Sequence, residues 1–376
     1  MGQVPSRFLS GVNTFPAKHA MATFPVVPTQ WQVTKGDDFI PFRQSTDYTA
    51  TAAGTGATAA AFAWNGGALK ITAGSTSTFK SFEALGANSL QFVPGNNLWH
   101  DVRLAVPVIG TNPATDSAVY TGFFDNVDPT AATNGVYFYK PAGGTAVHFI
   151  ILKAGTTTTF QNVGDLQYPS GLYADPIGSN GALTFNATGT AFSTVTVTTP
   201  GFGYRTAPLI VPTGTAGSGA QVYCQLGGSA GYPTADSQGN GSSLYNAIIT
   251  APGSGYTAGT LGAEVYPWIN FQFAYNGKGR LIAAINGKIV LGFDRTGGTN
   301  VTAGSTYNNA TVGVGPFYNA SGTTLAAGLM SAPPPAGDIY NILPMVPLQL
   351  AFGMVGSTGT NRVMYAEEIN LGTELN

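Results

Sequence analysis

Short runs of alternating apolar and polar residues, each closed by turn residues, recur along most of this chain. In the run VYFYK, Val136 and Phe138 alternate with Tyr137 and Tyr139. Because successive side chains of a strand point to opposite faces, this period marks half-buried β-strands. Pairs of turn-forming residues separate the runs, at 112–113, 128–129, 134–135 and 143–144. Short strands divided by frequent turns are typical of an all-β sandwich or barrel.

The pattern predicts strands at these residue numbers: 68–73, 89–93, 98–109, 118–126, 135–139, 146–153, 220–226, 268–276, 280–285, 288–293, 347–355 and 362–371. The run Asn276-Gly277-Lys278-Gly279 predicts a hairpin between two of them. Residues 49–61 are rich in Ala, Thr and Gly, and we expect a loop or a weak edge strand there. No segment predicts a long helix, although 325–330 is long enough for one turn.

Charged side chains are scarce in this sequence. Asp, Glu, Lys and Arg make up 9% of the chain, where roughly 25% is usual for a soluble domain. A surface with so little charge resists association weakly, so we expect neighbouring subunits to cover much of it. Disorder is the competing explanation, but disordered chains have few aromatic residues, and this chain has 17 Tyr and 22 Phe.

The composition also argues against several classes of partner. The formal net charge is −2 and the basic residues are scattered singly, so the chain lacks the basic stripe that binds nucleic acid. No apolar stretch has the length of a signal peptide core or a membrane helix, so we expect synthesis and folding in a cytoplasm. The single cysteine, Cys224, cannot form an intrachain disulfide, and we interpret it as a small buried apolar residue.

Residues 1–30 predict an extended N-terminal arm, because four prolines in this stretch fix φ and remove backbone donors. The stretch is nevertheless apolar, and we expect it to dock either on its own domain or on a neighbouring subunit. Its interface candidates are Phe8, Leu9, Phe15, Phe24, Val26 and Val27.

One internal repeat is present. Residues 195–204 are VTVTTPGFGY and residues 247–256 are AIITAPGSGY. We expect the prolines to end the strands, the glycines to supply positive φ for tight turns, and the tyrosines to fold back as anchors. These repeat-turn residues are Pro200, Gly201, Gly203 and Tyr204 in the first copy, and Pro252, Gly253, Gly255 and Tyr256 in the second. Two copies are too few for a stacked array, so they predict one compact module.

This Pro-Gly-x-Gly-Tyr turn, placed after a strand of Val, Ile and Thr, resembles a repeat found in structural proteins of tailed bacteriophages, including cyanophages. The second copy fits best, since the first has Phe202 where Ser is usual. The rest of the chain resembles the concanavalin A-like jelly roll in WHDVRLAV, in INFQFAYNGKGRLIAAINGKIV and in RVMYAEEINL. In such folds the first and last strands pair, which leaves loops free to accept an insertion.

These observations predict an all-β chain: a concanavalin A-like jelly-roll β-sandwich with an inserted small β module and an extended N-terminal arm. The expected boundaries are 1–30 for the arm, 31–189 for the first part of the sandwich, 190–261 for the module and 262–376 for the second part of the sandwich.

Catalytic patterns are absent from the sequence. Glycoside hydrolases of this jelly-roll class need paired carboxylates, and Glu367 and Glu368 are adjacent, so in a strand they face opposite ways. His19, His100 and His148 have no second His or Cys at ligand spacing, so we expect no metal centre. A Ser-His-Asp triad assembled in space stays open. We predict a protein that is not an enzyme and that binds no cofactor.

Two weaker binding features are present. Asp125, Asn126 and Asp128 offer oxygen atoms for calcium in a loop, although an Asx-rich turn before Pro129 explains them better. Aromatic clusters at 123–124, 137–139 and 266–273 could stack on sugars, although alternation sends half of these rings to the core.

The resemblance implies a virion component made in a host cytoplasm, and in particular a capsid decoration or cement protein on the shell surface. Its partners would be the major capsid protein and copies of itself as a homotrimer or homodimer, without nucleic acid or membrane. The alternative is a tail-fibre or spike adhesin that binds a host surface glycan.

Overall fold

The structure, a computed structural model, describes residues 6–9, 12–14, 32–37, 48–53, 57–62, 67–74, 80–106, 117–142, 146–165, 179–202, 204, 206–213, 217–227, 243–286, 288–293, 339–356 and 362–374. Within these ranges the chain is almost entirely β-strand, with short 3-10 helices at Pro129–Ala131 and Ile339–Asn341 and no α-helix. No helix among them is long and apolar enough to cross a membrane.

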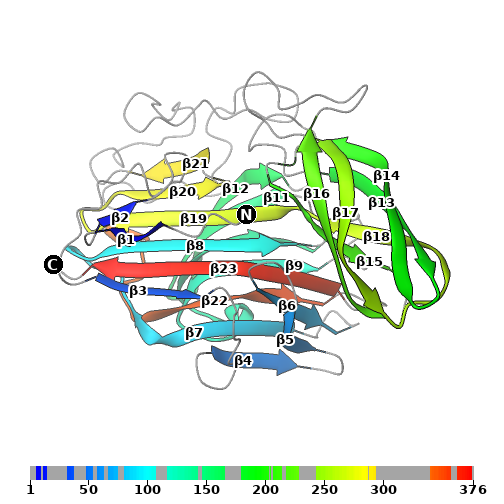
Figure 1. The fold of residues 1–376 in the computed structure, drawn as a ribbon. Coiled ribbons are helices and arrows are strands. Elements are labelled where there is room, and N and C mark those ends of the chain that lie inside the picture. The colour runs from blue at the N-terminus through cyan, green and yellow to red at the C-terminus, as the bar shows by residue number, and fades with distance from the viewer. Residues whose placement is uncertain are drawn as a thin grey trace.

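Two antiparallel sheets form a sandwich (Figure 1). The seven-stranded sheet has the order β12 (Thr156–Asp165), β11 (Ala146–Lys153), β10 (Gly135–Lys140), β9 (Ala118–Phe124), β22 (Leu348–Val355), β7 (Lys80–Leu90) and β4 (Tyr48–Ala53). The eight-stranded sheet has the order β21 (Lys288–Phe293), β20 (Leu281–Ile285), β19 (Trp268–Asn276), β8 (Asn97–Ala105), β23 (Arg362–Glu374), β6 (Ala68–Ala73) and β5 (Thr58–Phe62), with β3 (Gln32–Asp37) also paired to β23.

The main core lies between these sheets and consists of the inward residues of both. Val102, Phe271 and Ile369 come from the eight-stranded sheet, and Phe138 and Phe352 come from the seven-stranded one. All five are buried, as the period-two pattern requires. The predicted fold class, an all-β jelly-roll sandwich, is confirmed.

The first and last strands of the sandwich pair with each other. β3 covers residues Ile369–Glu374 of β23, and β6 covers the preceding half of the same edge, from Arg362 to Ala366. The two ends of the sandwich are therefore closed in one sheet, and an insertion elsewhere in the chain need not disturb them.

Most predicted strands lie within two residues of their observed bounds, but one expectation needs correction. The strand predicted at 89–93 is wrong, because β7 ends at Leu90 and a turn with Gly95 at φ 94° follows. Residues 49–61, expected to be a loop or a weak edge strand, contain two edge strands, β4 and β5. Trp99 does not share the inward face of β8, since its ring lies over the backbone of Gly372 on β23.

Six further strands lie between β12 and β19 in sequence and stand together at one end of the sandwich (Figure 1). A four-stranded sheet has the order β14 (Ala191–Phe202), β13 (Ser179–Thr188), β18 (Gly259–Tyr266) and β15 (Leu209–Pro212). β16 (Ser218–Gly227) and β17 (Ser243–Ser254) form a hairpin. We refer to these six strands as the inserted module; its first strand begins before residue 190 because β13 pairs with both β14 and β18.

The module has its own hydrophobic core. Phe185, Phe192 and Cys224 are buried there, together with both repeat tyrosines, Tyr204 and Tyr256. The repeat strands β14 and β17 lie side by side, and β15 pairs with β18, so the two repeat copies enclose one core between them. The free thiol of Cys224 is buried, and burial raises its pKa to about 12.

Near the N-terminus, Ser6–Leu9 (β1) pairs with Val12–Thr14 (β2) in a short antiparallel hairpin. Phe8 and Leu9 belong to β1, but their side chains lie outside the described part of the structure. Phe15, Phe24, Val26 and Val27 lie outside the described residues, as does the turn predicted at 325–330. The docking of the arm therefore stays a prediction.

Candidate interaction surface on the inserted module

The inserted module is almost free of charge. Between Ser179 and Ala263, none of the described residues is Asp, Glu, Lys, Arg or His. The first charged side chain on its described strands is Glu264, near the end of β18. The low charge content of the whole sequence is therefore most pronounced in this module.

One broad surface of the module is a field of hydroxyl groups, which we call the threonine face. On β14, Thr194, Thr196 and Thr198 are exposed, while Val195 and Val197 between them pack on the module core. β13 and β18 extend the surface with further exposed residues: Asn186, Thr188 and Thr260. The alternation of Thr and Val in the run TVTVT therefore gives β14 an apolar inner side and an uncharged, hydroxylated outer side.

Hydrogen bonds tie this face together across three strands. Asn186 on β13 donates from Nδ2 to Thr194 Oγ1 at 3.1 Å, and its Oδ1 accepts from Thr260 Oγ1 at 2.9 Å. Thr198 Oγ1 donates to the carbonyl of Ala182 at 3.1 Å. The polar groups of the face are thus largely paired with one another, and their side chains are held in place.

The outer side of the β16–β17 hairpin is a second uncharged surface. Tyr223 and Ile248 are a cross-strand pair, and their side chains are 40% and 45% exposed. Tyr245 is 63% exposed. Next to them, Asn246 Nδ2 donates to Gln225 Oε1 at 3.2 Å. Sequence reasoning missed both this patch and the threonine face, although the TVTVT run is a visible signal for the latter.

The repeat turns form part of the frame that carries these surfaces. The expectation that the prolines end the strands is wrong by two residues, because Pro200 pairs with Gly181 and Pro252 with Ala220 inside the ladders. Each strand continues past its proline to a glycine with positive φ. In β17 this residue is Gly253, whose φ is 64°. Gly201 and Gly255 also have positive φ, at 58° and 78°, and Gly203 lies outside the described residues.

The repeat tyrosines are anchored in the module core. The ring of Tyr256 packs against that of Phe192 with centroids 4.1 Å and planes 33° apart, and its hydroxyl accepts from the Ala220 amide at 3.3 Å. A Cβ on Gly217 would lie 2.4 Å from this ring, so only glycine allows the close approach. Tyr204, from the first copy, is also buried.

The loop proposed for calcium satisfies its oxygen atoms internally. Asp125 accepts from the Thr133 amide at 3.0 Å and from Thr133 Oγ1 at 2.7 Å, and Asn134 donates to it as well. These bonds outweigh the effect of partial burial and hold the pKa of Asp125 below its ordinary value. Asp128 caps the helix Pro129–Ala131 by accepting from the Thr130 amide. The Asx-rich turn accounts for all these contacts.

Two glutamates on the described strands are bound to neighbouring side chains. Glu367 forms an ion pair with Arg103 at 2.6 Å, and Glu264 accepts a hydrogen bond from the Tyr266 hydroxyl. No cluster of three or more His, Cys, Asp or Glu suited to a metal occurs among the described residues.

The predicted aromatic clusters divide between core and outer face. Phe123 and Phe138 are in the main core, whereas Phe124 and Tyr137 lie on the outer face of the seven-stranded sheet. On that face a row runs across the strands, with Tyr120 4.8 Å from Tyr139 between ring centroids.

This row offers rings but little exposed area. Burial raises the pKa of Tyr137 to about 12, and neighbouring Tyr139 contributes to the shift. Burial likewise lowers the pKa of His148 at the end of the row. The rings are therefore packed mainly on one another.

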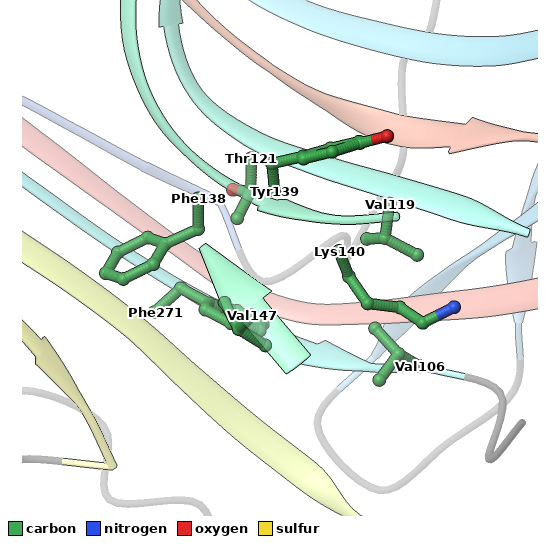
Figure 2. Close-up of a pocket in the computed structure, with 8 residues that line it drawn as sticks. All are labelled: Val106, Val119, Thr121, Phe138, Tyr139, Lys140, Val147 and Phe271. Atoms are coloured by element: carbon green, nitrogen blue, oxygen red, sulfur yellow. The ribbon is translucent and has the colours of Figure 1, made fainter. Parts of the chain in front are cut away.

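A small cavity lies at the edge of the main core and has a volume of about 10 Å³ (Figure 2). Its lining consists of Val106, Val119, Thr121, Phe138, Tyr139, Lys140, Val147 and Phe271. Lys140 is buried and donates from Nζ to the carbonyl of Ser117 at 2.7 Å. A space of this size holds at most about one water molecule, so it is not a ligand pocket.

No protein-family model matches the chain, and no curated protein matches it in sequence. Among solved structures, a protein of unknown function from Shewanella oneidensis MR-1 is 8% identical with a TM-score of 0.37, and the match covers 94% of this chain and 92% of that one. An endo-1,3-beta-glucanase from Streptomyces sioyaensis is 10% identical with a TM-score of 0.37, covering 93% and 99%. A carbohydrate esterase from the Shiga toxin-encoding bacteriophage phi24B is 11% identical with a TM-score of 0.27, covering 88% and 91%. At these scores the assignment of the fold rests on the strand order and the core described above.

Proposed function

We propose that this chain is a non-catalytic structural protein of a virion, a capsid decoration or cement protein that stabilises a shell by adhesion between subunits. The observation that carries the proposal is the threonine face: a broad, exposed β-surface with internal hydrogen bonds and no described charge. The resemblance of the repeat to structural proteins of tailed bacteriophages supports the virion part.

Burying the threonine face against a partner would cost little free energy. Desolvating a charged group is far more expensive than desolvating a hydroxyl, and the threonine face has no charged group. Asn186, Thr194 and Thr260 already bond to one another, and Thr198 bonds to a backbone carbonyl, so a partner would leave few of these polar groups unsatisfied. Threonine is also stiff at χ1, so little side-chain entropy would be lost on binding.

The area of the face sets how the assembly would be built. β14, β13 and β18 have 12, 10 and 8 residues, so they span at most roughly 40 Å by 14 Å at the usual strand rise and spacing. One such contact lies near the lower limit for a stable interface, roughly 1,200 Å² counted over both partners. Each subunit would therefore need more than one contact, as copies arranged about a symmetry axis have.

Exposed edge strands provide a further contact of suitable chemistry. β4 and β5 are the last strands of the two sandwich sheets, and Thr58, Ala60 and Ala61 on β5 are exposed. Natural proteins commonly protect such edges with charge, which β5 lacks. We propose that these edges also meet neighbouring subunits in the assembly.

The test places a charge in the centre of the threonine face. In the variant Thr196→Lys, we expect at least a 10-fold weaker association of the full chain, measured by sedimentation equilibrium and by co-sedimentation with capsid shells. The matched control is Thr157→Lys on β12, an exposed threonine outside the module. A wild-type chain that stays monomeric and does not bind shells would refute the proposal, as would equal losses in both variants.

The N-terminal arm is tested separately. Deleting residues 1–28 should abolish incorporation into the particle while the remaining protein stays folded. Normal occupancy by the truncated protein would show that the arm has no such role.

A further inference from the structure

Large apolar side chains are exposed at few places in the described part of the chain, and three of them gather on one side of the β16–β17 hairpin. These are Tyr223, Tyr245 and Ile248. We call them, together with Gln225 and Asn246, the tyrosine patch. The proposed role in assembly rests on the threonine face and does not require this patch.

A β-bulge aims one of the rings outward. Gln225 pairs with Asn246 and Leu226 pairs with Leu244, so Tyr245 is the extra residue of β17 at this point. Bulges of this kind redirect a side chain that regular alternation would send to the other face. A Cβ built on Gly227 would lie 3.3 Å from Tyr245 Cβ, so the base of this side chain rests against a bare glycine backbone.

The two tyrosines are set apart along the hairpin. Tyr223 is directly opposite Ile248, and the bulge places Tyr245 between the levels of Gln225 and Leu226, two to three residues from Tyr223. At the usual rise of a strand, the two backbone positions are roughly 7–10 Å apart along the hairpin. That distance is wider than a single sugar ring, so a ligand that covers both tyrosines must have at least two units.

Between the rings lies an amide pair. The bond from Asn246 Nδ2 to Gln225 Oε1 holds both side chains across the ladder. It leaves Gln225 Nε2 as a donor and Asn246 Oδ1 as an acceptor toward a ligand. The patch thus alternates apolar rings with a paired donor and acceptor, which matches the apolar C–H faces and hydroxyl rims of sugars.

The charge and the area of the tyrosine patch indicate which kind of ligand it can bind. No charged residue occurs among the described residues of β16 and β17, so the patch has no partner for an acidic sugar or a charged peptide. A second copy of the chain would also be neutral, but the outer face of a two-stranded hairpin measures only roughly 35 Å by 10 Å. That is less than half of the roughly 800 Å² that each partner contributes to a stable dimer.

We propose that the outer face of the β16–β17 hairpin binds a neutral oligosaccharide. Tyr223 and Tyr245 stack on two sugar units, while Gln225 and Asn246 bond the hydroxyls between them. The site lies on the inserted module, away from both outer faces of the sandwich, and its ligand is an uncharged glycan of at least two units.

The test uses the full-length protein and a panel of neutral gluco-, manno- and galacto-oligosaccharides of one to six units, with sialylated and uronic acid glycans alongside. We expect binding to at least one neutral oligosaccharide and none to its monosaccharide. In Tyr245→Ala and in Tyr223→Ala we expect the dissociation constant to rise about 10-fold or more. Tyr245→Phe keeps the ring and should bind normally, and Met345→Ala removes an exposed apolar side chain outside the module as a matched control.

Several outcomes would overturn the inference. These are a failure to bind any neutral oligosaccharide, a preference for acidic glycans, or unchanged binding in both Tyr→Ala variants. If Tyr245→Ala weakened association between subunits and left sugar binding intact, the patch would be a protein interface instead. Thr196→Lys should leave sugar binding unchanged, so failure of the assembly role and failure of the glycan site give different results.

Discussion

Acid should destabilise this protein through one buried histidine, His100. Its ring is fully buried in the main core, stacked on Phe273 with centroids 4.6 Å apart and planes 8° apart, and edge-on to Phe123. Nε2 lies 3.1 Å from Thr121 Oγ1, which joins the two sheets. Burial lowers the pKa of His100 from 6.5 to about 3, while nearby Asp101 opposes the shift.

The sign of the effect follows from the direction of this shift. Between pH 6.5 and about 3, the unfolded chain protonates His100 and the folded chain does not, so folding stability falls as the pH falls. Above pH 6.5 the full contribution is present. Each pH unit in the window removes about 1.4 kcal/mol, so about 2 kcal/mol is lost by pH 5 and about 5 kcal/mol by pH 3.

The measurement compares urea unfolding of the wild type and of His100→Gln from pH 7.5 to pH 4. Gln does not titrate and can still bond to Thr121, and every other titratable group is common to both proteins. The difference in unfolding free energy between the two proteins should change by about 2 kcal/mol between pH 7.5 and 5, in favour of the variant. Thr121→Val keeps the histidine and should keep the wild-type slope. Parallel pH profiles for wild type and His100→Gln would refute the reasoning.

Three further predictions concern packing and the junction with the module. In Gly122→Ala the new Cβ would lie 2.4 Å from Tyr137 Cβ, and the overpacking should cost about 1–3 kcal/mol in urea unfolding, more than Gly262→Ala, where the nearest atom is 3.3 Å away. Arg103→Ala removes the ion pair with Glu367 and the 3.0 Å bond to Thr206 Oγ1. We expect the free energy of unfolding to fall by about 3 kcal/mol and amide exchange in residues 206–213 to become faster. Unchanged exchange would argue against this link between sandwich and module. Tyr256→Phe removes the acceptor for the Ala220 amide and should cost about 1 kcal/mol in thermal unfolding, whereas an unchanged melting temperature would show that this bond contributes nothing.

Sequence patterns located the strands of the sandwich well where apolar and polar residues alternate. The segments 146–153, 268–276 and 288–293 coincide with β11, β19 and β21. Alternation fails where a strand is composed of small or hydroxylated residues. β7 (KSFEALGANSL) and β12 (TTTTFQNVGD) lack a clear apolar period, and the ladder to a neighbouring strand determines them instead.

The surfaces were harder to predict than the strands, for physical reasons that differ. The threonine face can be predicted from the alternation of Thr and Val once it is known that one side of β14 packs on a hydrophobic core. The sequence alone does not show that it does. The tyrosine patch depends on the bulge at Tyr245, and a one-residue irregularity between two strands is set by pairing and not by local sequence. Trp99 shows the same limit, since its place over Gly372 depends on a strand more than 250 residues away.

The two copies of the repeat explain why the outer surfaces of the module are available for binding. Each copy contributes one hairpin, β13–β14 or β16–β17, and the strand that follows it, β15 or β18. Neither hairpin could bury its apolar side alone, because the shared core draws Phe185 and Phe192 from one copy and Leu244 and Tyr256 from the other. The inward positions of both copies are thus committed to folding. Only the outward positions remain to contact a partner, and the described ones among them carry threonines, amides and tyrosines in place of charge.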